Sequence, residues 1–178
     1  DALGANTTGA YNVAVGANAL DANTTASNNV GIGQSALGAN TTGANNVAMG
    51  YGSGQRNTTA GNNTFIGYGS GGGTWVTAAS SGSVGIGTNT LKGAMNAADY
   101  NVAVGYQSGV NVTTSGQNTL MGKEAGYNLT TGGNNTMIGS ETGYNSVDVD
   151  RTVLLGKNAG YAGNMTADAD GTISIGYD

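Results

Sequence analysis

Four aspartates near the C-terminus have a spacing that could bring their carboxylates together around a cation. The pairs Asp148/Asp150 and Asp168/Asp170 each lie eight and six residues before a glycine. If the two segments stack in register, the four carboxylates lie about 4.8 Å apart from one segment to the next. Ca²⁺ prefers such oxygen ligands, so it is the one cofactor that this cluster would hold. The alternative is a set of solvated acidic turns beside Arg151, and a glycosidase acid pair is disfavoured because no aromatic subsite surrounds the cluster.

A second group of residues could bind a sugar or a protein. The segment Gly71-Gly72-Gly73-Thr74-Trp75-Val76 contains the single Trp of the chain. An exposed Trp on a loop is a common anchor for ligands, and Thr74 and Tyr100 are its candidate companions. The alternative is that Trp75 folds back and covers the edge of the structure.

The composition excludes several other kinds of chemistry. The 178 residues include neither His nor Cys, which removes the commonest general base, thiol nucleophiles and disulfides. Only five Lys and Arg residues are present, widely scattered, and the net charge is −5, so no nucleic-acid partner is expected. No apolar run reaches the length of a membrane span, so membrane insertion is not expected either. We therefore expect a protein that is not an enzyme.

Glycine recurs along the whole chain at the end of a short apolar run, and its spacing defines a repeat. The interval is 17 residues in most steps and 18 or 20 in the others. Such a period indicates one structural unit stacked on its own copies. We expect a single array over residues 1–178, which starts and stops within a repeat and is thus a piece of a longer fibre. The repeat glycines are Gly16, Gly33, Gly50, Gly67, Gly87, Gly105, Gly122, Gly139, Gly156 and Gly176.

The residues before each glycine predict a short strand. Segments such as Asn12-Val13-Ala14-Val15 alternate and are rich in β-branched side chains, whereas the rest of the repeat is rich in Gly, Asn and Thr, which favour turns. Seventeen residues suffice for one coil of a parallel β-solenoid, or β-roll. The predicted fold is all-β with about ten coils. Asn recurs four residues before most of the glycines, which predicts a hydrogen-bonded ladder along the axis.

The alternation also predicts which side of each strand is buried. The first and third strand residues are apolar or Thr, so their side is predicted to be the core. The middle residue points the other way, yet it too is mostly apolar or Gly, which indicates a second partner surface. We therefore expect a homo-oligomer. A monomeric solenoid with a mildly apolar outer side is the alternative. The expected interface comprises Phe65, Leu120, Met137 and Leu154.

The segments Asn62-Asn63-Thr64-Phe65-Ile66-Gly67-Tyr68 and Asn134-Asn135-Thr136-Met137-Ile138-Gly139 resemble known repeats. They are similar to the repeats of bacteriophage tail fibres, notably marine and cyanophage ones, and more distantly to the head β-rolls of trimeric autotransporter adhesins. The resemblance covers the whole chain and implies a left-handed, homotrimeric β-roll on a virion or cell surface. It specifies architecture more firmly than function.

These observations predict a structural fibre or stalk segment of a phage tail fibre or surface adhesin, with a cell-surface glycan or protein as the receptor of its irregular loops. The alternative is an ice-binding solenoid, suggested by the Thr-Thr pairs that recur at one corner. Adjacent residues of a strand point to opposite sides, however, and the pairs are interrupted, which disfavours a flat ice-binding array.

Overall fold

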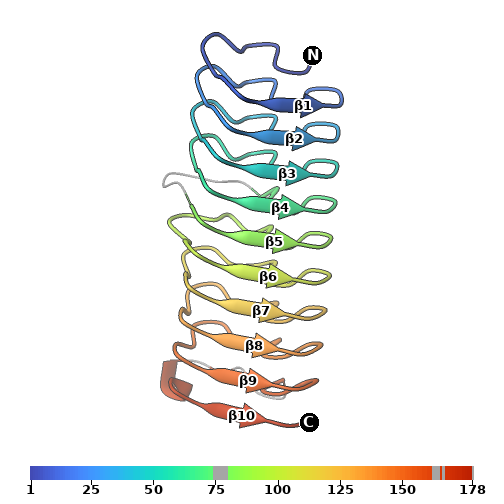
Figure 1. Cartoon of the computed structure of the whole chain (residues 1–178). Coiled ribbons are helices and arrows are strands. Elements are labelled where there is room, and N and C mark those ends of the chain that lie inside the picture. The colour runs from blue at the N-terminus through green and yellow to red at the C-terminus, as the bar shows by residue number, and fades with distance from the viewer. Residues whose placement is uncertain (74–79, 162–164, 166, 178) are drawn as a thin grey trace.

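The fold is a stack of coils built on one parallel sheet, which confirms the predicted β-solenoid (Figure 1). The computed structural model describes residues 1–73, 80–161, 165 and 167–177. Ten three-residue strands follow one another in sequence order, and a 3₁₀ turn lies at Ala167–Ala169. The strands are β1 (Val13–Val15), β2 (Val30–Ile32), β3 (Val47–Met49), β4 (Thr64–Ile66), β5 (Val84–Ile86), β6 (Val102–Val104), β7 (Thr119–Met121), β8 (Thr136–Ile138), β9 (Val153–Leu155) and β10 (Ile173–Ile175).

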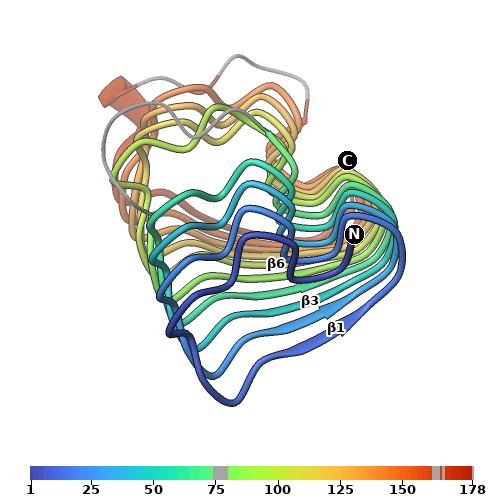
Figure 2. The same ribbon diagram turned by 90° about the horizontal axis from the view of Figure 1, so that it is seen from above.

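Successive coils superimpose without a shift in register. Val13 pairs with Val30, and Val30 pairs with Val47, one repeat further on. Seen along the axis, the strands form one wall and the loops fold back beside it (Figure 2). The repeat glycine makes this stacking possible: Gly33 has a φ of +123°, and a Cβ there would lie 2.6 Å from the carbonyl oxygen of Gly50. Only glycine satisfies both the positive φ and the close approach of the next coil.

The middle residue of each strand faces the interior, so the predicted assignment of the two sides is wrong. Most of the middle residues are fully buried, whereas Val13 and Ile175 keep 47% and 73% of their surface exposed. The residues expected at an oligomer interface therefore lie in the core of their own chain and cannot form that interface. They are Phe65, Leu120, Met137 and Leu154.

The interior is filled by complementary side-chain sizes, which is the physical reason for this correction. In three coils whose middle residue is small, the residue four positions after the repeat glycine is a buried leucine, as Leu20 is in the coil of Ala14. Where it is large, as Leu120 is, that position is glycine, and a Cβ at Gly126 would lie 2.9 Å from the Leu120 side chain. Each coil encloses little volume, so the middle residues of the strands vary in size to fill it. Their apolar character therefore needs no partner chain to explain it.

The predicted Asn ladder is confirmed. The backbone N–H of Asn46 donates to Oδ1 of Asn29, and that of Asn63 donates to Oδ1 of Asn46, at 2.9 and 3.0 Å. Each side-chain amide also donates to a turn carbonyl, as Asn46 does to Ala60 at 2.9 Å. These buried polar groups thereby satisfy one another from coil to coil.

Candidate functional site

The outward side of the strands is the most extended uniform surface of the described residues. We call it the outer sheet face, and it consists of the first and third residues of β1 to β10. Its third-position side chains are partly exposed, with Met121 at 40% and Ile138 at 39%. The first position is Val, Thr or Ile, and neither position carries a charged residue in any strand. An uncharged, mostly apolar face of this length is a candidate interaction surface.

The structure places only part of the sequence-derived binding cluster. Thr74 and Trp75 lie outside the described residues. Tyr100 is 63% exposed and has a φ of +59°. Its ring lies against the preceding coil, because a Cβ on Gly82 would be 2.6 Å from Cδ1 of Tyr100. Tyr100 thus packs part of its ring against Gly82 and exposes the rest to solvent.

Two of the four aspartates hydrogen-bond to the backbone of the preceding coil. The carboxylate of Asp150 accepts from the backbone N–H of Gly133, and that of Asp170 accepts from the backbone N–H of Asp150 at 2.7 Å. Asp170 also forms an ion pair with Arg151 at 3.3 Å. Asp168 is exposed in the 3₁₀ turn, and Oδ1 of Asp148 is buried without a hydrogen-bond partner.

This arrangement gives Asp150 and Asp170 a structural role at the joint between coils. Within the part of the chain that the structure describes, no group of three or more metal-ligating side chains comes together. Two of the carboxylates direct an oxygen toward a backbone N–H instead. Binding of Ca²⁺ by these four residues stays a prediction.

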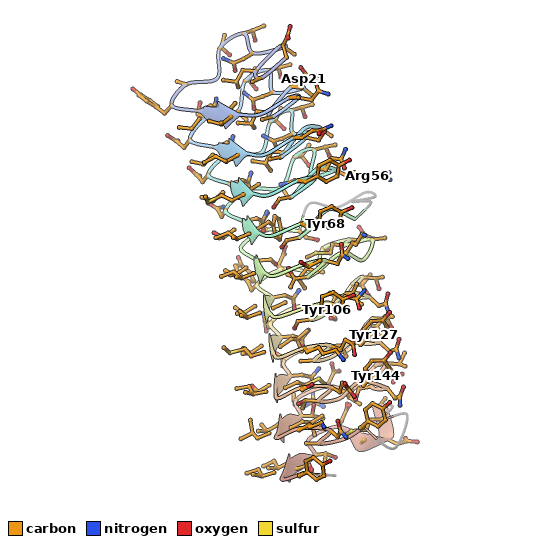
Figure 3. The ribbon with its side chains drawn as sticks, turned by 90° about the vertical axis from the view of Figure 1, so that its right-hand side faces the viewer. Asp21, Arg56, Tyr68, Tyr106, Tyr127 and Tyr144 are labelled. Carbon is orange, nitrogen blue, oxygen red and sulfur yellow. The ribbon has the colours of Figure 1, made fainter. Side chains whose placement is uncertain are left out.

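Tyrosines form a ladder on the side of the coils away from the strands (Figure 3). The rings of Tyr127 and Tyr144 stack at 4.7 Å between centroids, and Tyr161 continues the ladder at 5.4 Å. Burial, followed by the charge of Tyr127, raises the pKa of the Tyr144 hydroxyl. Tyr127 and Tyr144 stack nearly in parallel and Tyr161 lies tilted against Tyr144, so the ring faces between neighbours are already in contact. The ladder therefore offers hydroxyl groups and ring edges rather than open aromatic platforms.

Beside the ladder, Lys123 is held by two carboxylates. Its ammonium lies 3.1 Å from Glu141 and 3.3 Å from Glu124. Hydrogen bonds to Glu141 and then Glu124 raise the pKa of Lys123. Lys123 is exposed, so water and salt screen this network and it contributes little to stability.

The Thr-Thr corner differs from an array built to bind ice. The first Thr of each pair uses its hydroxyl within the stack: Oγ1 of Thr7 donates to the carbonyl of Thr24, and Oγ1 of Thr24 donates to that of Thr41. The second Thr is exposed, as at Thr25 and Thr42. The corner thus presents a single file of free Thr side chains rather than a two-dimensional array.

No family model matches the chain, and comparison with curated proteins and with solved structures finds no similar protein. Among the described residues, no helix has the length and apolar character needed to cross a membrane.

Proposed function

We propose that this chain is a non-enzymatic structural segment of a fibre or stalk, in a phage tail fibre or surface adhesin, and that it self-associates through the outer sheet face. The observation that carries this proposal is the uncharged, mostly apolar character of that face over all ten strands. At about 4.8 Å per strand the face is about 45 Å long. An apolar stripe on this scale is typical of interaction surfaces.

Several features of the coil favour a mechanical role. All the strands pair in one parallel ladder along the axis, and the buried Asn ladder adds side-chain hydrogen bonds between coils. Separating any two coils breaks these bonds together, so the fold resists both shear and proteolysis. A virion or cell-surface location suits such a segment.

The geometry of the face favours three copies around a common axis. Each face is only three residues wide, so two copies packed face to face would leave the sides of both apolar columns exposed. Three narrow faces can enclose a common core, in a closed symmetric assembly. We further propose that receptor recognition belongs to the irregular coils between Gly67 and Gly105, where Thr74, Trp75 and Tyr100 lie.

Sedimentation equilibrium tests this proposal. The wild-type chain should sediment at about 52 kDa, three times the 17.4 kDa of one chain. Met121→Asp combined with Ile138→Asp places two carboxylates on the outer sheet face and should give monomers that keep the β-sheet circular dichroism. Substituting Leu120 and Leu154 with Asp should instead unfold the chain, because those side chains are buried.

The matched control is Thr114→Asp combined with Thr131→Asp. These exposed residues belong to the same two coils, and the equivalent positions later in the chain are Asp148 and Asp168. The control should remain trimeric. A wild-type chain that sediments at 17.4 kDa across the micromolar range contradicts self-association. If that monomer also shows thermal hysteresis that the Thr control abolishes, the ice-binding alternative is supported instead.

A further inference from the structure

A second column of tyrosines lies at the corner that directly follows the strands. Tyr51, Tyr68 and Tyr106 each stand one residue after their repeat glycine, and Thr88 holds the same place in the coil between Tyr68 and Tyr106. The residue that follows each of the last three donates its backbone N–H to the carbonyl of the column member in the preceding coil, at 2.8 to 2.9 Å. These four residues therefore lie directly above one another.

Thr88 interrupts the stacking of this column. The rings of Tyr51 and Tyr68 stack with 5.4 Å between centroids and an interplanar angle of 9°. Because these rings belong to successive coils, their faces are turned along the axis. Thr88 is much shorter than a tyrosine, so the column lacks one ring between Tyr68 and Tyr106, and we call this interval the Thr88 gap. Equivalent residues two coils apart are separated by about 9.6 Å.

The two tyrosines that border the Thr88 gap are open to solvent. Tyr68 is 56% exposed although it stacks on Tyr51, and Tyr106 is 49% exposed. Tyr144, which has a ring on either side, is less exposed than both. Figure 3 shows Tyr68 and Tyr106 on a different side of the coils from the outward strand side chains. The Thr88 gap thus stays accessible when the outer sheet face is covered.

The polar groups around the Thr88 gap are neutral. Thr88 carries a hydroxyl, and Asn89 and Gln107, which directly follow Thr88 and Tyr106, carry amides. Such groups donate to and accept from the hydroxyls of a ligand. In these three coils, neither the first nor the second residue after the repeat glycine is charged. A neutral ligand therefore suits the gap better than an ionic one.

We propose that the Thr88 gap binds one neutral pyranose unit of a glycan, inserted edge-on so that each face of the sugar lies on one tyrosine ring. The inference rests on the proposed receptor recognition by the irregular coils, and it names the site and the chemistry. An inserted ring lies about 4.8 Å from each phenol along the axis. A puckered saturated ring, with axial C–H groups on both faces, fills this interval more fully than a flat aromatic group does.

The sandwich also selects the configuration of the sugar. Both sugar faces must present C–H groups, because a hydroxyl pressed onto a phenol ring would lose its hydrogen bonds to water. The β-gluco configuration meets this condition, since all of its ring substituents are equatorial and point to the edge. The edge that enters the gap can then bond to the hydroxyl of Thr88.

Isothermal titration calorimetry with cellotetraose, a linear chain of β-linked glucose units, tests the proposal. The wild-type chain should bind it. Mannotetraose of the same linkage has one axial hydroxyl on each unit and should bind about tenfold more weakly. Tyr106→Ala should weaken the binding of cellotetraose about fivefold, through the loss of one stacked face.

Thr88→Tyr places a tyrosine ring where the sugar is proposed to lie. It should abolish binding and leave the β-sheet circular dichroism unchanged, since tyrosine already holds this place in the coils of Tyr68 and Tyr106. Ser140→Tyr is the matched control, because it adds the same ring at the same place in a coil outside the gap. It should bind cellotetraose as the wild-type chain does.

The proposal is overturned if cellotetraose does not bind, if Thr88→Tyr still binds it, or if mannotetraose binds equally well. It is also overturned if N-acetyltryptophanamide binds more tightly than cellotetraose, because the gap would then accept an aromatic side chain. The Thr88 gap lies within one chain, so its failure and that of self-association are separable. A trimer that does not bind cellotetraose overturns only the sugar site, whereas a monomer that binds it supports the sugar site and contradicts self-association.

Discussion

One side chain per strand reaches the interior of each coil, so single residues determine how well the core is filled. Ala48 and Gly54 are both small, and side chains of the neighbouring coils fill the space in their coil. A Cβ on Gly54 would lie 3.0 Å from Leu37 and 3.4 Å from Phe65. A void in one coil therefore affects its neighbours as well. The sequence contained this information in the paired sizes of the middle residue and the position four after the glycine.

Exchanging the two sizes within one coil tests this description. Leu120→Ala should destabilise the fold by about 2–5 kcal/mol, since it leaves a cavity. Gly126→Leu alone should also destabilise it, because a Cβ there lies 2.9 Å from Leu120. The double variant restores the arrangement of Ala14 and Leu20, where Leu20 has a φ of +51° and Gly126 one of +60°.

The double variant should therefore be more stable than Leu120→Ala, although a left-handed leucine costs about 1–2 kcal/mol relative to glycine. Urea denaturation of the four proteins gives the coupling energy. Additive effects of the two substitutions would contradict the proposed packing relation.

At the scale of the element, the joint between successive turns is closed by side chains six residues before the repeat glycine. Ser27 accepts from the backbone N–H of Ala10 at 3.0 Å, and Asp99 accepts from that of Ser81 at 2.6 Å. Asp150 and Asp170 continue this pattern. The sequence showed that the aspartates recur in register but not that each would face a backbone donor, because that contact depends on the offset between coils.

Asp170→Ala should therefore lower stability by about 1.5–3 kcal/mol through loss of a charge-assisted hydrogen bond. Asp168→Ala is the matched control and should change stability little, since Asp168 is exposed in the same coil. Thermal unfolding with and without millimolar Ca²⁺ measures both variants. We expect the difference between them to be independent of Ca²⁺. A Ca²⁺-dependent rise in Tm that Asp168→Ala removes would support the calcium site instead.

For the whole molecule, the sequence predicted the period, the parallel stacking and the Asn ladder, because each of these depends only on spacing and residue type. It predicted the wrong side of the strand as the core, because the middle residue is the one that faces inward. Alternation separates the two sides of a strand, but when both are apolar only the size of the enclosed space decides which is the core.

The whole stack should tolerate the loss of one complete coil, because each coil contacts only its neighbours. Deleting residues 118–134 removes 17 residues and joins Gln117 to Asn135. In the shortened chain Met137 takes the place of Leu120 beside Gly109. A Cβ on Gly109 would lie 2.8 Å from Leu120, so the glycine leaves room for a large side chain there. The shortened chain should keep its circular dichroism and unfold cooperatively. Small-angle scattering should show a particle shorter by about 4.8 Å.

Deleting residues 118–133 instead removes one residue fewer and leaves an extra residue in the joining coil. The turn before β8 must absorb that residue. Only then can Asn135 take the place of Asn118 in the Asn ladder. If the strand itself shifts by one residue, its inward and outward side chains exchange sides, and the polar Thr136 takes the inward place of Leu120. This variant should therefore lose far more stability than the 17-residue deletion. Equal stability of the two deletions would contradict a stack held in register by equivalent columns.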